Sequence, residues 1–246
     1  MLRLMCVTAH PDDEAADFGG SLLLYQARGV ETFVLCLTPG QAGSHRGGAQ
    51  TDHDLAALRR KEFHASCEIL RVSRSLVLDY PDGKLHRQDL YRVVCEVTAQ
   101  VREFRPHVML AMGPEGSVTG HTDHSMASVF ATLAFEWAGR NNRYPDQLSY
   151  GVTPHRVQKL YYSTAETPLP GRQPITLPPV TAAIAIGEYL ETKITAFKAH
   201  VSQQPLWSLF EDNVRLRGPV EKFHLVASVK PGRMSFEDDL FDGAAE

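Results

Sequence analysis

Polar and apolar positions follow two periods along residues 1–139. Short, nearly continuous apolar runs occupy residues 2–9, 31–38, 75–80 and 106–112. Apolar side chains recur at helical spacing in the segments that follow these runs, at 14–29, 52–72, 87–104 and 121–139. Apolar strands that alternate with helices are typical of parallel sheets covered on both faces. The pattern therefore predicts an α/β fold with a mostly parallel sheet and helices on both faces.

The pattern changes after residue 139. Seven of the fifteen prolines lie within residues 141–180, which we interpret as a variable, proline-rich excursion with one strand-like stretch. Another strand, a helix and a last strand are expected at 182–187, 188–202 and 222–229. The acidic residues 237–246 predict a frayed tail. Because no repeat divides the sequence, we expect a single domain spanning 1–246.

Composition narrows the function classes. The chain has 25 basic and 29 acidic residues and no cluster of Lys and Arg, so a nucleic-acid partner is not expected. No apolar run reaches membrane-spanning length, and the N-terminus does not resemble a signal peptide. The four cysteines lie in apolar stretches without C-x-x-C spacing, as in reducing compartments. These features predict a cytoplasmic protein, and exposed strands at the end of the sheet favour a homo-oligomer.

Polar segments follow each of the first four predicted strands. They are "HPDDE" (10–14), "PGQAGSHRGG" (39–48), "DYPDG" (79–83) and "GPEGSVTGHTDH" (113–124). Ligands of open α/β sheets bind beyond the carboxyl ends of the strands, so these segments are expected to meet at one edge. A dinucleotide is disfavoured there, because the first turn lacks G-x-G-x-x-G and its carboxylates would repel a phosphate.

A metal ion suits this edge better. His10 and Asp13 are three residues apart across a tight turn, and His121 and His124 share one face of a helix start. Two imidazoles and one carboxylate, with a fourth position open, are the usual ligands of catalytic zinc, which lowers the pKa of bound water to about 7. The other aspartate of the pair, Asp12, is then placed to accept a proton from the bound water. Spacing does not decide which of the two histidines is the ligand, and either pattern alone is also common without a metal, for example as charge at a helix N-terminus.

"AHPDDE" followed by "GHTDH" resembles the PIG-L/LmbE-like deacetylases, zinc enzymes that remove acetyl groups from N-acetylglucosamine derivatives. "TPGQAG", "LRRKEFHASCEIL", "LDYPDG" and "FKAHVSQ" extend the resemblance over most of the chain. It implies a Rossmann-like α/β fold and a Zn²⁺ cofactor, with Fe²⁺ or another divalent metal as an alternative. It also implies roles for five residues. These are metal ligation by His10, Asp13 and His124, general-base catalysis by Asp12, and stabilisation or protonation of the tetrahedral intermediate by His121.

The same resemblance suggests contacts to a sugar. Arg59 matches an arginine that binds sugar hydroxyls in relatives, although Arg60 is an alternative match. Asp82 and Glu14 are the other expected substrate contacts, while "PDG" around Asp82 is also a strong turn signal. No role is assigned to the histidines at positions 45 and 200.

The resulting prediction is a zinc-dependent hydrolase that deacetylates a small N-acetylglucosamine-type conjugate. Two alternatives remain at this point, namely an amidase acting on a related sugar–thiol conjugate and a sugar-binding protein without catalytic activity. The sequence does not specify the group attached to the sugar.

Overall fold

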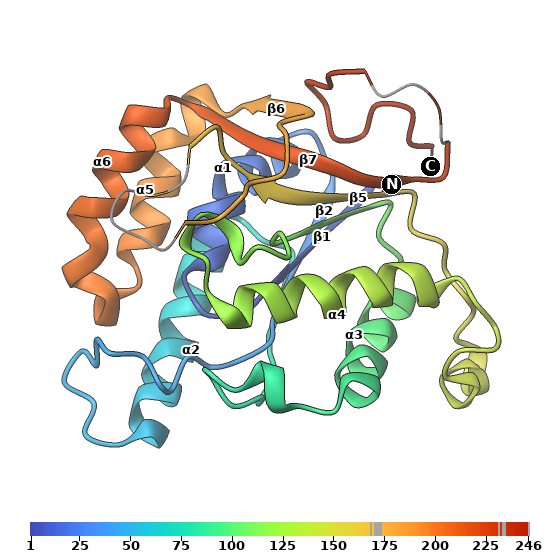
Figure 1. Cartoon of the computed structure of the whole chain (residues 1–246), viewed down its shortest axis with the longest axis horizontal. Coiled ribbons are helices and arrows are strands. Elements are labelled where there is room, and N and C mark those ends of the chain that lie inside the picture. Colours follow the sequence, from blue (N-terminus) through green and yellow to red (C-terminus); the bar gives the residue numbers. More distant parts are fainter. Residues whose placement is uncertain (168, 170–173, 231, 233–234, 246) are drawn as a thin grey trace.

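The computed structural model describes residues 1–167, 169, 174–230, 232 and 235–245 (Figure 1). Positions 168 and 170–173 of the proline-rich segment, and Glu246 of the predicted tail, lie outside the described residues. None of the helices in the described part of the chain combines the length and hydropathy needed to cross a bilayer.

A seven-stranded sheet forms the centre of the molecule, in the order β3-β2-β1-β4-β5-β7-β6. The first five strands in this order run parallel, whereas β7 pairs antiparallel with β5 and β6. The predicted mostly parallel α/β fold is therefore confirmed. The strands are β1 (Arg3–Thr8), β2 (Glu31–Cys36), β3 (Arg74–Val77), β4 (Val108–Ala111), β5 (Lys159–Thr164), β6 (Ala182–Ala185) and β7 (Val220–Ser228).

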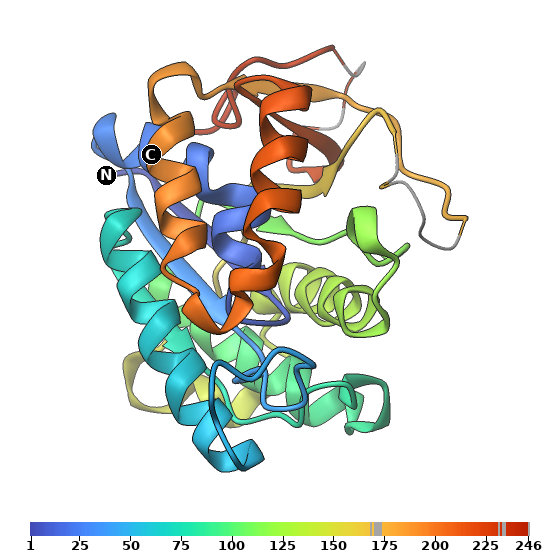
Figure 2. The same cartoon turned by 90° about the vertical axis from the view of Figure 1, so that its left-hand side faces the viewer.

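Helices cover both faces of this sheet (Figures 1 and 2). They are α1 (Asp13–Ala27), α2 (Asp52–Ile69), α3 (Leu90–Phe104), α4 (Thr122–Ala138), α5 (Leu190–Lys198) and α6 (Trp207–Arg217). Short 3₁₀ turns lie at Leu85–Arg87, Ser117–Thr119, Pro145–Gly151, Gly187–Tyr189 and Val201–Leu206.

Alternating side chains of β1 divide the core into two layers. Leu4 and Cys6 pack in the layer that contains α1, α2 and α5, whereas Met5 and Val7 pack in the layer that contains α3 and α4. Successive side chains of a strand point to opposite faces, so a strand that is buried on both faces is apolar throughout. This explains the continuous apolar run at the start of the sequence.

The C-terminal segment differs from its prediction. Leu240 is buried, and the Glu237 carboxylate accepts hydrogen bonds from Lys159 Nζ at 2.7 Å and from the Tyr161 hydroxyl. Residue 237 also forms a bridge with Ala182 in the edge strand β6. The prediction of a frayed tail was wrong for these residues, because two apolar side chains inside the acidic run, Leu240 and Phe241, anchor it to the core.

Candidate active site

The two histidine motifs meet because their strands are neighbours. His10 and Asp13 follow β1, His121 and His124 begin α4 after β4, and β1 pairs with β4 in parallel register. Both motifs therefore lie at the carboxyl edge of the sheet. One ring nitrogen from each of His10, His121 and His124 lies within 4.8 Å of the other two.

The turn after β1 is held by the Asp13 carboxylate. Its Oδ2 accepts hydrogen bonds from the backbone N–H groups of Ala9 at 3.1 Å and His10 at 2.7 Å. Asp12 adopts a positive φ of 113°, a conformation that costs a residue with a side chain about 1–3 kcal/mol. The Asp12 N–H donates to Glu14 Oε2 at 2.9 Å, which helps to hold this conformation. The two adjacent carboxylates have different partners, with Arg59 bound to Asp12 and His124 beside Asp13.

His124 presents one ring nitrogen to Asp13. Its Nε2 lies 3.3 Å from Asp13 Oδ1, while its Nδ1 lies 3.2 Å from the carbonyl oxygen of Gly116 and 3.2 Å from Thr119 Oγ1. A carbonyl acceptor at Nδ1 favours the tautomer that leaves the Nε2 lone pair free, as in metal-binding histidines.

His10 uses its two ring nitrogens the other way round from His124, with Nδ1 toward Asp13 and Nε2 toward other carboxylates. Its Nδ1 lies 3.6 Å from Asp13 Oδ2, and its Nε2 faces Asp82 Oδ1 at 3.0 Å and Asp123 Oδ2 at 3.5 Å. Burial opposes protonation of His10, but Asp123, Asp82 and Asp13 outweigh it and raise its pKa to about 10. A histidine whose second nitrogen faces carboxylates is oriented and made more basic, which strengthens it as a ligand.

Backbone donors fix those two carboxylates. Asp82 accepts a hydrogen bond from Ala42 N at 2.9 Å. Asp123 is completely buried and accepts from Gly83 N at 2.6 Å and Leu85 N at 3.1 Å. His10, Asp82 and Asp123 also form a second cluster that could hold a cation. These bonds tie the loops after β3 and β4 to His10.

The three histidines, together with the Asp13 carboxylate beside His124, suit a divalent metal ion. Ligand atoms about 2.0–2.1 Å from a tetrahedral zinc ion lie about 3.3 Å apart, which matches the separation of His124 Nε2 and Asp13 Oδ1. His10 and His121 extend the same cluster, and the donors are nitrogen and carboxylate oxygen, which suit zinc and also iron or manganese.

Asp12 lies beside this cluster and faces the solvent more than its neighbours do. Its side chain is 17% exposed, compared with 8% for Asp13 and Asp82. Arg59 Nη2 donates to Asp12 Oδ2 at 3.0 Å, which leaves Oδ1 directed away from that bond. Burial raises the pKa of Asp12 to about 6, against the opposing charge of Arg59. A carboxylate with a raised pKa is a better proton acceptor than an ordinary one.

His121 stands at the exposed rim of the site. Its Nδ1 accepts a hydrogen bond from Asp123 N at 3.1 Å, which places the proton of the neutral ring on Nε2. Burial and the neighbouring His10 and His124 lower the pKa of His121. The neutral ring can therefore donate a hydrogen bond from Nε2 to an oxygen in the site.

Asp82 and one of the two candidate arginines lie at the site, whereas the other arginine does not. Asp82 lies at the site, against His10. Arg59 is buried and bonded to the carbonyl oxygens of Pro11 and Gly40 as well as to Asp12, whereas Arg60 binds the carbonyl oxygens of Val77 and Leu78. Of the two candidate arginines, Arg59 is therefore the one that reaches the site.

Glu14 lies beneath the site and does not face it. The residue is completely buried, and its Oε1 accepts from Ser66 Oγ at 2.6 Å and faces His200 Nε2 at 2.7 Å. The predicted substrate contact of Glu14 is wrong for this placement, because both of its oxygens are occupied by protein donors. Instead, Glu14 supports the backbone of the catalytic candidate Asp12.

Sequence reasoning overlooked several residues of this arrangement. Asp123 stands between the two histidines of "GHTDH", and that position was an available signal. Ser66 and His200 lack such a signal, because they meet Glu14 only through the fold.

Comparison with known proteins identifies the relatives of this arrangement. Residues 5–135 match the model of the PIG-L family, described as GlcNAc-PI de-N-acetylase. The chain is 29% identical over 215 residues to a diacetylchitobiose deacetylase of Thermococcus kodakarensis, covering 87% of this chain and 75% of that protein. It is also 29% identical over 269 residues to a 1D-myo-inositol 2-acetamido-2-deoxy-alpha-D-glucopyranoside deacetylase of Catenulispora acidiphila, covering 90% and 88%.

Solved structures share the fold. An N,N'-diacetylchitobiose deacetylase from Pyrococcus horikoshii superposes with a TM-score of 0.76 at 24% identity, over 91% of this chain and 83% of that chain. The 4-carboxy-2-hydroxymuconate hydratase GalB superposes almost as well, with a TM-score of 0.75 at 21% identity, over 96% of this chain and all of the other. Because enzymes of different reaction types share this architecture, the fold alone does not assign the reaction.

Proposed function

The chain belongs to the PIG-L family, and from this premise we propose that it is a zinc-dependent enzyme that removes the acetyl group from an N-acetylglucosamine unit carrying a further substituent. Its class is that of the deacetylases of N-acetylglucosamine-type conjugates, which hydrolyse an amide bond. The identity of the metal as zinc and the presence of a substituent on the sugar are the parts that we propose here.

One observation carries the proposal. Asp13 and His124 approach each other at a separation suited to a shared ion, and the carboxylate of the adjacent Asp12 is more exposed than that of Asp13. His10, Asp13 and His124 would hold the metal, which supplies a Lewis acid and lowers the pKa of a bound water to about 7.

Each of the remaining groups has a task in the hydrolysis. Asp12 Oδ1 accepts a proton from the attacking water, while Arg59 holds the other carboxylate oxygen. His121 Nε2 donates a hydrogen bond to the carbonyl oxygen as negative charge develops on it. When the carbon–nitrogen bond breaks, the proton held by Asp12 passes to the leaving amine, and acetate and the free amino sugar are the products.

Asp82 is the remaining candidate for a contact to sugar hydroxyls, and Arg59 contributes through Asp12. A sugar-binding protein that had lost catalysis is disfavoured, because the residues that we propose as base, metal ligands and oxyanion donor have all been kept and lie near one another.

Release of amine from N-acetylglucosamine and N,N'-diacetylchitobiose tests the proposal. We expect amine and acetate in equal amounts, loss of activity with a chelator, and recovery on addition of Zn²⁺. Fe²⁺ is the comparison metal. If the zinc-loaded protein releases no amine from any N-acetylated sugar, the proposed function is wrong.

A further inference from the structure

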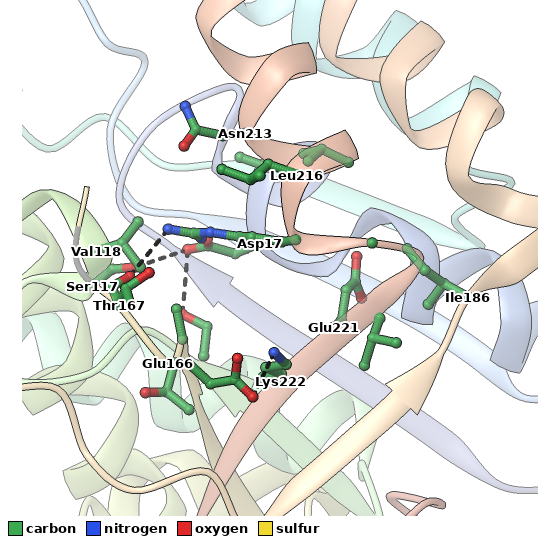
Figure 3. A pocket seen from close by; sticks show the side chains of 18 of the residues that line it. Asp17, Ser117, Val118, Glu166, Thr167, Ile186, Asn213, Leu216, Glu221 and Lys222 are labelled. Carbon is green, nitrogen blue, oxygen red and sulfur yellow. Dashed lines mark hydrogen bonds and ion pairs between the residues drawn. The ribbon is translucent and has the colours of Figure 1, made fainter. Parts of the chain in front are cut away.

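A cavity of about 390 Å³ opens between segments that are distant in sequence, and Figure 3 shows side chains that line it. It is formed by α1, the loop after β4, the end of β5, α6 and the start of β7. Its lining residues include Asp17, Ser117, Ser163, Asn213 and Arg217. Ligand pockets usually have volumes of about 300–1,000 Å³, so this space is large enough for a small molecule.

The cavity begins one helical turn from the metal ligands. Asp17 follows Asp13 by four residues on α1, which places their side chains on the same face with Cα atoms about 6 Å apart. Ser117 follows directly on Gly116, whose carbonyl oxygen contacts His124. A molecule bound at the metal site could therefore extend into the cavity.

Most charges in the cavity wall are already paired. Lys193 Nζ lies 2.5 Å from Glu221 Oε1, and Lys222 Nζ lies 2.9 Å from Glu166 Oε1. Glu221 also accepts hydrogen bonds from the backbone N–H groups of Gly20 and Ser21, both at 2.8 Å. These pairs need no further partner.

Asp17 and Arg217 are the exceptions. The Asp17 carboxylate accepts only two long hydrogen bonds from described residues, from the hydroxyls of Ser117 and Ser163, both at 3.3 Å and both to Oδ2 (Figure 3). Among the residues that the structure describes, Arg217 donates only to the carbonyl oxygen of Thr167, at 3.4 Å. Neither side chain lies within ion-pair distance of an opposite charge among the described residues, and the Asp17 carboxylate attracts the Arg217 guanidinium only from a greater distance. Burial raises the pKa of Asp17 to about 6, and the negative charge of Asp13 adds to this effect.

This pair of unused groups specifies a ligand chemistry. A carboxylate can accept about four hydrogen bonds and a guanidinium can donate five, so both retain most of their capacity. A hydroxyl group can donate a hydrogen bond to the Asp17 carboxylate and accept one from the Arg217 guanidinium. The lining holds three acidic and three basic residues, so it does not favour an anion such as phosphate. Charged and hydroxyl-bearing side chains stand among the apolar ones in this lining, which does not favour a long acyl chain either.

We propose that this cavity is the subsite for the polyhydroxylated ring that is attached to the N-acetylglucosamine unit, with Asp17 and Arg217 as its specificity-determining residues. This inference rests on the proposed function. The shared chemistry is a ring rich in hydroxyl groups, which is present both in a second pyranose and in an inositol.

Kinetics with substrates of different length test the inference. The probes are N-acetylglucosamine, N,N'-diacetylchitobiose and the inositol glycoside 1D-myo-inositol 2-acetamido-2-deoxy-alpha-D-glucopyranoside. We expect Arg217→Gln to lower kcat/KM for at least one extended substrate about tenfold or more, through KM, because it removes a charged hydrogen bond. Its kcat/KM for N-acetylglucosamine should stay within about twofold. The extended substrate that is affected identifies the ring.

Two further variants control this result. Arg215 lies on the same helix but pairs with Glu191 and Glu211, so Arg215→Gln should leave all three substrates unchanged. Asp17→Asn should reproduce the selective loss with normal metal content. Equal losses on short and extended substrates, or no loss on either extended one, would overturn the inference while leaving the proposed function intact.

Calorimetric binding separates the two failures. Wild-type protein should bind at least one extended probe about tenfold more tightly than N-acetylglucosamine, and Arg217→Gln should abolish this preference. If the preference is present and no amine is released, the proposed reaction is wrong and the subsite stands. If amine is released and the preference is absent, the subsite is wrong.

Discussion

Glu14 and Asp17 lie three residues apart on α1, but Glu14 is completely buried and Asp17 is partly buried at the cavity, and their surroundings differ. On the side of α1 that faces α2, Glu14 has short contacts with Ser66, His200 and the Asp12 N–H, between 2.6 and 2.9 Å. On the side that faces the cavity, Asp17 has two hydroxyl partners at 3.3 Å.

This difference indicates a structural role for Glu14 and a ligand-binding role for Asp17. Burying a charge is costly unless the protein pairs it, and a network in which every group has a partner is rigid. Glu14 thus holds the strained Asp12 in place, whereas Asp17 keeps acceptor capacity for a ligand. The next three predictions concern Asp12, Glu14 and Asp17, and so test both sides of α1. A fourth prediction concerns the start of α2, a more distant part of the supporting side, by which we mean the contacts of Glu14 and α2 that hold Asp12.

Asp12→Asn should give the largest effect. The amide keeps the shape of the side chain but does not accept a proton, so kcat should fall about 10²–10⁴-fold with metal content near that of the wild type. Asp13→Ala is the matched control, because loss of a ligand should instead deplete the metal. Elemental analysis beside steady-state kinetics distinguishes the roles, and a metal-free Asp12→Asn with a metal-loaded Asp13→Ala would reverse them.

Glu14→Ala should destabilise the protein strongly. It leaves His200 and Ser66 buried without their acceptor, and breaking a buried pair in this way costs about 3–5 kcal/mol. The free energy of unfolding in urea measures the loss. Asp17→Ala should lose far less, because its partners are distant. Glu14→Gln, which can keep one acceptor for the Asp12 N–H, should be less damaging and should lower kcat. Similar losses for Glu14→Ala and Asp17→Ala would remove the distinction between the two sides.

Asp17→Asn should change how stability depends on pH. Burial, with the charge of Asp13, raises the pKa of Asp17 from 3.8 to about 6, so the folded state binds this proton more tightly than the unfolded state does. The stabilisation is complete below pH 4 and is lost as the pH rises through 6. Wild type should therefore lose up to about 3 kcal/mol relative to Asp17→Asn between pH 4 and pH 7. Urea unfolding at several pH values measures the difference, and parallel curves would contradict it.

The sequence predicted those parts of the molecule that depend on local pattern. The period of apolar residues identified the first four strands, and strand neighbourhood followed from the parallel arrangement. The two short motifs around His10 and His124 pointed to the residues that we propose as metal ligands, because the members of each motif are close in sequence. Helix α6 was missed, since none of its residues is buried and its apolar side chains pack only partly, as Phe210 does against Phe197.

Contacts between residues that are distant in sequence could not be predicted from local patterns. Glu14 and His200 are 186 residues apart, so no sequence pattern indicates that the His200 ring contacts the Glu14 carboxylate. The same holds for Arg217, which reaches the cavity at the end of a helix that was not expected. Metal sites built from short motifs are therefore easier to predict than the surfaces that select the rest of the substrate.

Thr51→Ala should have the smallest effect and tests whether the supporting side depends on its buried network or on the end of α2. Thr51 Oγ1 accepts from Asp54 N at 3.1 Å, and Asp54 Oδ2 accepts from Thr51 N at 3.1 Å, in a capping box that begins the helix carrying Arg59. Loss of an N-cap usually costs about 1 kcal/mol, so the midpoint of urea unfolding should fall slightly. Arg59 lies two turns further along and is held by Pro11, Gly40 and Asp12, so kcat should not change. A fall in kcat comparable to that of Glu14→Gln would mean that the position of Asp12 depends on the whole of α2 and not on the buried contacts alone.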